Sequence, residues 1–152
     1  MADCIFCQII KGELPCAKVY ENEYVISFLD INPINAGHTL VLPKRHYATL
    51  FEISEEDLHA CTAASQKIAM AVYKATKASG LNFFQNNYRA AGQRVDHIHF
   101  HLIPRFHQDD FWRSWPSKPY PHGGLGKMLK KIQAELQLAP HQGFQPELRA
   151  RG

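Results

Sequence analysis

The sequence predicts a single α+β domain, in which one long helix and a C-terminal helix accompany a mostly antiparallel sheet. Short strand-like runs separated by turn-forming residues fill the first 50 positions. Residues 54–78 then carry apolar side chains at helical spacing, and strand-like runs return after them. A chain of 152 residues can bury one core without disulfides. We expect this domain to span residues 1–138 and residues 139–152 to form a flexible tail.

The composition excludes several classes of protein. Hydrophobic residues make up 45% of the chain and charged residues 20%, which argues against a disordered or fibrous protein. No stretch approaches the roughly 20 apolar residues of a membrane span, and the N-terminus lacks the basic start of a signal peptide. We therefore expect a cytoplasmic protein with no membrane partner. The net charge of +3 suits an anionic small molecule and gives little support to nucleic-acid binding.

The first predicted elements are three strands. Residues 18–20 and 24–29 form two of them, joined as a hairpin by a polar turn. The stretch 30–37 is rich in turn-forming residues and predicts a loop. Residues 38–43 then predict a third strand, which ends at a proline.

A long helix is predicted from about residue 54 to about residue 78. Ser54 opens a Ser-Glu-Glu-Asp run that resembles a capping box, and its acids favour the positive end of the helix dipole. Ser79 and Gly80 supply the stop. The helical face that belongs against the sheet consists of Leu58, Cys61, Ser65, Ile68, Val72 and Thr76.

The second half of the chain is predicted to add two strands, an irregular packed segment and a second helix. These elements are a strand at 81–86, a loop at 87–93, a strand at 95–104, an irregular segment at 105–124 that contains Trp112 and Trp115, and a helix at 125–138.

The strongest chemical signal is the run His-Ile-His-Phe-His-Leu-Ile at residues 97–103. On a strand, alternate side chains share a face, so the apolar residues would point to the core and the imidazoles of His97, His99 and His101 would line up opposite. Neighbours on that face lie roughly 6 to 7 Å apart. One imidazole can then reach a phosphorus atom while its neighbour contacts the phosphate oxygens.

Two other interpretations of this run remain open on spacing alone. A histidine-rich solvated face is one, although alternation within a core strand matches it poorly. A catalytic zinc site is the other, because two histidines two positions apart on a strand, with a third from elsewhere, can hold zinc and leave one position open.

The run resembles the signature of the histidine triad (HIT) superfamily, and the chain is similar to bacterial-type members that carry an N-terminal Cys-x-x-Cys. The resemblance covers about residues 4–105 and implies a HIT-like fold. It also implies a homodimer whose long helices and a strand pair across a two-fold axis. The other matching segments, in family order, are residues 4–10, 28–33, 37–46, 85–87, 92–93 and 103–105.

The resemblance implies a two-step displacement at a nucleoside α-phosphate, with no cofactor for catalysis. His99 would attack and form a covalent nucleotidyl intermediate, from which water or another acceptor releases a nucleoside monophosphate such as AMP. One nitrogen of His99 must be unprotonated, so the other should donate to the backbone carbonyl of His97. His101 and His38 would flank the phosphate and supply hydrogen-bond donors.

Nucleotide contacts carry over from the resemblance position by position. Asp30 matches the acid that holds the ribose hydroxyls, since a carboxylate accepts two hydrogen bonds. An apolar slot around the base is matched by Ile5, Phe6, Ile9 and Phe28, for which core packing is the alternative. The loop that approaches the phosphate is matched by Asn86, Gly92 and Gln93, beside His99 and His101.

Arg94 departs from the pattern, because many members have Ser or Thr three residues before the first triad histidine. That hydroxyl is thought to assist the leaving group, so a preference for phosphoramidates is not expected here. A guanidinium can instead clamp the extra phosphates of a longer leaving group. We therefore expect dinucleoside polyphosphates to be preferred over adenylates and phosphoramidates. Arg94 also keeps open an alternative function, a nucleotide-binding regulatory module with little turnover.

Cys4 and Cys7 raise the question of a metal. By resemblance they would hold a structural zinc together with His46 and His97, since two cysteines and two histidines form a closed tetrahedral set. The alternative is a pair of reduced thiols beside the base pocket. A zinc-bound His97 could not also act as a catalytic base, which leaves His99 as the reactive group.

Overall fold

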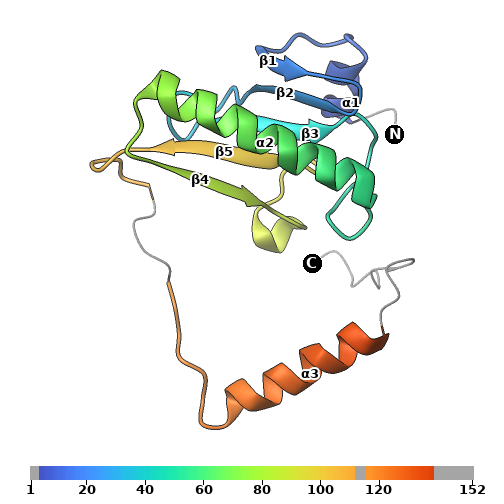
Figure 1. The fold of residues 1–152 in the computed structure, drawn as a ribbon, viewed down its shortest axis with the longest axis vertical. Helices are drawn as coiled ribbons and strands as arrows, with labels where there is room; N and C mark the ends of the chain where they lie inside the picture. Colours follow the sequence, from blue (N-terminus) through green and yellow to red (C-terminus); the bar gives the residue numbers. More distant parts are fainter. Residues whose placement is uncertain (1–3, 112–115, 139–152) are drawn as a thin grey trace. The chain divides into compact units, whose positions relative to one another are not determined.

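The computed structural model describes residues 4–111 and 116–138. The chain divides into two units, Met1–Phe111 and Trp112–Gly152. The first unit holds five strands and the helices α1 and α2, and the second holds helix α3 (Figure 1). A domain spanning residues 1–138 stays a prediction. The predicted tail at 139–152, Trp112 and Trp115 lie outside the described residues.

The strands form one antiparallel sheet in the order β1-β2-β3-β5-β4. This confirms the predicted α+β class with an antiparallel sheet. The hairpin of β1 and β2 is also present, with an irregular register between Lys18 and Tyr20. The strands are β1 (Lys18–Glu21), β2 (Val25–Leu29), β3 (Thr39–Pro43), β4 (Gly80–Gln85) and β5 (Phe100–Arg105).

Strand β5 is shorter than predicted, because the sequence pattern placed its start at residue 95 and it begins at Phe100. The preceding residues bond to the end of β3 and to the chain that follows it, instead of joining a regular ladder. The Ile98 N–H donates to the Tyr47 carbonyl at 2.7 Å, and His97 Nε2 lies 2.9 Å from the Pro43 carbonyl. His97, Ile98 and His99 are nevertheless all buried, so the buried part of the chain begins before the strand does.

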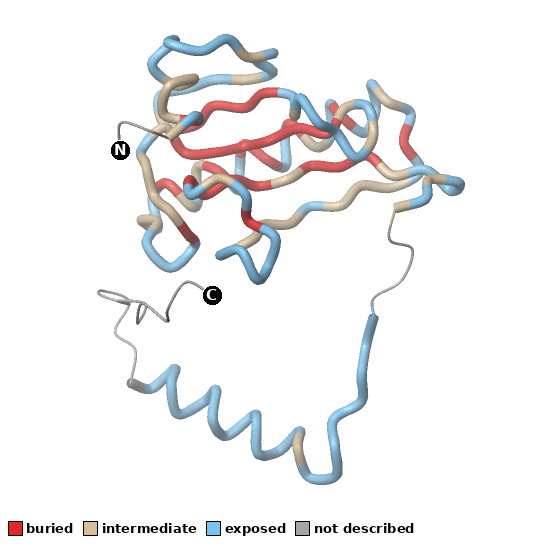
Figure 2. Tube along the Cα trace, turned by 180° about the vertical axis from the view of Figure 1, so that it is seen from behind, coloured by how far each residue is buried: buried red, intermediate tan, exposed pale blue. Residues whose placement is uncertain are grey.

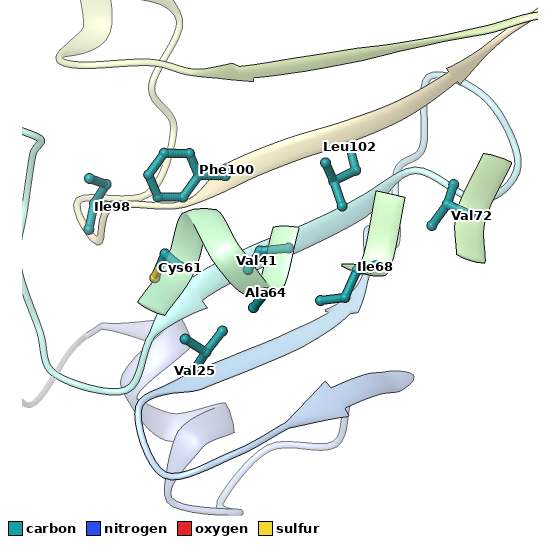
Figure 3. Close-up of a cluster of buried hydrophobic side chains, with 9 residues drawn as sticks. All are labelled: Val25, Val41, Cys61, Ala64, Ile68, Val72, Ile98, Phe100 and Leu102. Carbon is teal, nitrogen blue, oxygen red and sulfur yellow. The ribbon is translucent and has the colours of Figure 1, made fainter. Parts of the chain in front are cut away.

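Helix α2 (Glu55–Thr76) covers one face of the sheet, close to the predicted bounds. Ser54 caps its N-terminus by accepting the Asp57 N–H at 3.2 Å, and Lys77 ends it in the left-handed conformation with φ 53°. Cys61 lies fully buried in the core between helix and sheet. This core comprises Val25, Val41, Cys61, Ala64, Ile68, Val72, Ile98, Phe100 and Leu102 (Figure 3).

Helix α1 (Ile5–Ile10) was not predicted. Its six residues are too few to be stable alone, and its N-cap Cys4 makes no side-chain capping bond. Tertiary contacts hold it, because Phe6 packs in a second buried cluster. That cluster comprises Phe6, Ile26, Phe28, Leu40 and Leu42.

Helix α3 (Gly124–Leu138) confirms the predicted C-terminal helix. Nearly all of its residues are exposed, whereas buried residues concentrate in the sheet and in α2 (Figure 2). Within residues 4–111 and 116–138, no helix combines the length and the apolar character that crossing a membrane requires.

Candidate active site and metal centre

The predicted catalytic histidines meet on the sheet face opposite α2. His101 lies in β5 and pairs with Leu40 of β3, whose side chain belongs to the core cluster around α1. His99 directly precedes β5, and His38 directly precedes β3. Their rings are in contact, with centroids 4.9 Å apart for His99 and His101 and 5.2 Å apart for His38 and His101.

His99 is held with one nitrogen free to react. Its Nδ1 lies 2.7 Å from the His97 backbone carbonyl. A carbonyl can only accept, so Nδ1 carries the proton and Nε2 keeps its lone pair. Burial lowers the pKa of His99, although its bond to His97 opposes this shift. Phe6 stands edge-on to the ring at a centroid distance of 5.2 Å. The neutral, oriented imidazole that the chemistry needs is therefore in place.

His38 and His101 form a hydrogen-bonded chain whose direction the backbone fixes. The Ile34 N–H donates to His38 Nδ1 at 3.2 Å, so the neutral His38 ring carries its proton on Nε2. That proton is donated to His101 Nδ1 at 2.9 Å, which leaves the proton of His101 on Nε2. Burial, then the charges of His99 and His38, lower the pKa of His101 to about 3. His101 is thus a neutral donor suited to a phosphate oxygen.

Asp30 lies at the edge of this histidine cluster. Its Oδ1 accepts the Asn32 N–H at 2.8 Å, while Oδ2 is 3.8 Å from His38 Nε2. Together with His101 these groups have possible ligand atoms within 4.8 Å of one another. A metal there would have to open the bond between the two histidines, so we assign the set to hydrogen bonding. The partly exposed carboxylate can accept bonds from sugar hydroxyls.

The residues predicted to line the base slot differ in burial. Phe6 and Phe28 pack edge to face at 5.5 Å and are buried. Ile9 is half-buried, whereas Ile5 is 45% exposed. Core packing accounts for the two phenylalanines, and Ile5 has the free surface that a base would cover. Their contact with a nucleotide stays a prediction.

The buried side chain of Gln93 holds the loop between β4 and β5 in place through hydrogen bonds to backbone groups. Its side chain is buried and donates to the carbonyls of Ala48 at 2.6 Å and Val95 at 3.1 Å. Its amide oxygen accepts the Tyr88 N–H at 2.7 Å. Gly92 has φ +87°, which favours glycine. Gln93 therefore shapes the loop, a role that the sequence did not reveal because its partners are backbone groups.

Arg94 and Asn86 were also predicted to contact the nucleotide. Arg94 is exposed, and its carbonyl accepts a bond from Arg89. Asn86 is half-buried, and its Nδ2 lies 3.6 Å from where a Cβ on Gly92 would be. Both residues stand on the loop that enters the histidine run, and their roles stay predictions.

Cys4, Cys7, His46 and His97 converge into a second cluster that can bind a metal, with ligand atoms within 4.8 Å of one another. Both sulfurs lie 3.6 Å from His97 Nδ1. His46 Nδ1 lies 3.3 Å from Cys7 Sγ and 3.3 Å from His97 Nδ1. The other nitrogen of His97 donates to the Pro43 carbonyl at 2.9 Å, so Nδ1 presents its lone pair to the cluster. The side chain of His97 is part of this cluster, whereas its backbone carbonyl accepts the hydrogen bond from His99 Nδ1.

These spacings fit the edges of a zinc tetrahedron. With Zn–S about 2.3 Å and Zn–N about 2.0–2.1 Å, sulfur and nitrogen lie about 3.6 Å apart and two nitrogens about 3.3 Å apart. The observed sulfur–nitrogen distances are 3.3 and 3.6 Å, and the nitrogen–nitrogen distance is 3.3 Å. Four of the six edges of such a tetrahedron therefore have the spacing that a zinc ion requires, and all the donor atoms lie within 4.8 Å of one another.

Comparison with known proteins gives consistent matches. The family model described as the HIT domain matches residues 11–108. Adenosine 5'-monophosphoramidase HNT1 of Saccharomyces cerevisiae is 42% identical over 137 residues, covering 90% of this chain and 84% of the relative. Adenylylsulfatase HINT3 of Arabidopsis thaliana is 44% identical over 112 residues, covering 74% of this chain and 57% of the relative.

Solved structures show the same architecture. The crystal structure of SMU.412c from Streptococcus mutans superposes with a TM-score of 0.85 at 44% identity, covering 90% of this chain and 87% of that one. A Zn-bound histidine triad family protein from Mycobacterium smegmatis gives a TM-score of 0.69 at 36% identity, covering 91% of this chain and 99% of that one.

Proposed function

Because this chain belongs to the HIT domain family, we propose that it is a nucleotide hydrolase that cleaves at a nucleoside α-phosphate through a covalent intermediate on His99. Relatives named as an adenosine 5'-monophosphoramidase and an adenylylsulfatase support the class of reaction. One observation carries the mechanism. The 2.7 Å bond from His99 Nδ1 to the His97 carbonyl leaves Nε2 as a nucleophile beside the His101 donor.

In the first step, the lone pair of His99 Nε2 forms a bond to the α-phosphorus. The bond from phosphorus to the leaving oxygen or nitrogen breaks, and that atom keeps the electron pair and takes a proton from solvent. Water then attacks the phosphorus, the P–N bond returns its pair to Nε2, and the proton of the water passes to solvent. His101 Nε2–H stabilises the charge on the phosphate oxygens in both steps.

Arg94 directs the proposed substrate preference. Its guanidinium matches phosphate geometry, and it stands on the exposed part of the loop before the histidine run. We assign it to the additional phosphates of a dinucleoside polyphosphate, with Asp30 on the ribose. Loss of this preference in Arg94→Ser is the expected result.

We assign zinc to the cluster of Cys4, Cys7, His46 and His97. The tetrahedral spacing of its donors supports a closed structural site, and a Zn-bound relative is known. When bound, such an ion would cross-link α1 to the segment before β5. It would take no part in the reaction at the phosphate. Elemental analysis of protein purified without added metal or chelator tests the assignment.

A homodimer formed through β4 and α2 is part of the proposal. Strand β4 is at the edge of the sheet, and a surface hollow beside it is lined by Ala69, Met70, Tyr73, Lys74 and Leu81. Met70 and Tyr73 are 56% and 45% exposed. A second copy would cover both the unpaired strand edge and these side chains. Light scattering of wild type and Tyr73→Lys tests this, with a monomeric variant expected.

The activity test compares AMP release from diadenosine polyphosphates and from an adenosine phosphoramidate. His99→Ala is expected to abolish turnover on both compounds. His59→Ala is the matched control, because His59 is exposed on α2, and α2 covers the face of the sheet opposite the histidine cluster. Rapid quenching followed by mass spectrometry should find a nucleotidyl group on wild type that is absent from His99→Ala.

Each result decides between two functions. Turnover that depends on His99 supports the hydrolase, and the better compound gives the leaving-group class. AMP binding by wild type without turnover on either compound would contradict the proposal and favour the regulatory binding module instead.

A further inference from the structure

The loop from Asp30 to His38 carries the carboxylate proposed to contact the ribose and the histidine that bonds to His101. One asparagine in its middle connects this loop to the far end of β5. Asn35 Nδ2 donates to the Pro104 carbonyl at 2.8 Å and to Asp109 Oδ2 at 2.9 Å. Besides the bond from His38 to His101, these are the long-range side-chain bonds found for this loop in the described part of the chain. Asn35 thus spans 69 and 74 positions of sequence with a single amide.

Asp109 is itself held rigidly. Its Oδ2 accepts from Arg105 Nε at 2.8 Å and from the Phe106 N–H at 2.9 Å, and its Oδ1 accepts from an Arg105 terminal nitrogen at 2.7 Å. Arg105 also donates to Asn82 of β4 at 2.6 Å. The bidentate guanidinium–carboxylate geometry fixes both partners. Asn35 is therefore bonded to a point that two strands hold in place.

Backbone hydrogen bonds at the other end of the loop connect Asn35 to the His38 imidazole and to Asp30. The His38 N–H donates to the Asn35 carbonyl at 3.0 Å, and the Asp30 N–H donates to the His38 carbonyl at 2.9 Å. The Ile34 N–H, immediately before Asn35, sets the proton position of His38. A shift at Asn35 consequently moves Asp30, the Ile34 N–H and the His38–His101 bond together.

From this network we infer that Asn35, anchored on the Arg105–Asp109 pair, is a positioning residue for the nucleotide site. It holds the loop that presents Asp30 to the sugar and His38 to His101. The inference rests on the proposed function for the identity of the ligand, an adenine nucleotide. We assign Asn35 no contact with the phosphate or the sugar, because its side chain bonds to Pro104 and Asp109 and it acts through the backbone of the loop.

The test measures AMP affinity by calorimetry, kcat and thermal stability for Asn35→Ala, Asp109→Ala and the double variant. Asn35→Ala should weaken AMP binding about tenfold, the loss expected for roughly one net hydrogen bond. The double variant should be little weaker than the more affected single variant, because Asp109 acts on the loop through its bond to Asn35. The controls are Asn32→Ala and Asp110→Ala, which remove exposed side chains of the same types three residues from Asn35 and one residue from Asp109.

The inference is overturned if Asn35→Ala binds AMP within twofold of wild type, or no more weakly than Asn32→Ala. Additive losses in the double variant also overturn it. A fall in melting temperature with unchanged affinity would show a purely structural role. The conservative variant Asn35→Ser, which keeps one short donor, should retain more affinity than Asn35→Ala.

Failure of the proposed function is recognised separately. If wild type binds AMP without hydrolysing it, the affinities still test the positioning role. If wild type binds no AMP, imidazole ¹⁵N–¹H spectra provide the readout. The shared proton of His38 and His101 should lose its signal in Asn35→Ala and keep it in Asn32→Ala, and retention in both would refute the inference.

Discussion

Gly37→Ala is a sharp test of how the loop before β3 is packed. Gly37 has φ +96°, and a Cβ there would lie 2.6 Å from Thr76 Cγ2 at the end of α2. The left-handed backbone costs an alanine about 1–3 kcal/mol. Insertion of a methyl into this packed contact costs about 1–3 kcal/mol more. The free energy of unfolding should therefore fall by about 2–6 kcal/mol, the sum of those two costs.

Thr76→Ser separates the two costs. It removes Cγ2, the clashing atom, and keeps the hydroxyl that donates to the Val72 carbonyl at 2.8 Å. In the double variant the packing cost should disappear and the backbone cost should remain, so about half of the lost stability returns. Thr76→Ser alone should change the stability by less than about 1 kcal/mol.

Urea unfolding monitored by circular dichroism measures these differences, because the denaturation midpoint scales with the free energy of unfolding at constant slope. Thermal melting provides a second measure, at about 2–4 °C for each kcal/mol in a chain of about 150 residues. Equal stabilities of Gly37→Ala with and without Thr76→Ser would refute the clash. A Gly37→Ala variant as stable as wild type would refute both terms.

Three further predictions follow from the site and from α2. Cys7→Ser should lose the bound metal while Cys16→Ser, outside the cluster, keeps it, as elemental analysis would show. Burial lowers the pKa of His101 to about 3 from an ordinary value of about 6.5, so the unfolded chain takes up its proton first. The free energy of unfolding should therefore fall as the pH drops from 6.5 towards 3, and less steeply in His101→Gln. Ser54→Ala removes the bond that caps α2 and should lower stability by about 1 kcal/mol in urea, with an unchanged slope.

The fold was largely predictable because local pattern and tertiary packing agree in most elements. Ser54 marked the start of α2 by its capping chemistry, and the alternation around Phe100 identified the buried strand face. Helix α1 was not predicted because its N-cap Cys4 makes no side-chain capping bond and its six residues owe their helical form to the packing of Phe6. The start of β5 was wrong by five residues, since no pattern in the sequence shows that Ile98 bonds to Tyr47.

The identity of the site residues was more predictable than their connections. Alternation placed His99 and His101 on one face, as the structure has them. The direction of the proton chain depends on a backbone N–H at Ile34, and backbone groups leave no trace in side-chain patterns. The bond from Gln93 to the Ala48 carbonyl and the bond from Asn35 to Asp109 were likewise not predictable, because they join residues 45 and 74 positions apart.

Because Cys61 is buried, the reactivity of its thiol can report when α2 detaches from the sheet. Its thiol is fully enclosed between α2 and the sheet, and burial raises its pKa to about 12. A thiolate is the reactive form, so alkylating reagents should modify this cysteine only when α2 separates from the strands. The rate of its alkylation under native conditions would then measure how often that layer opens, without any label being introduced.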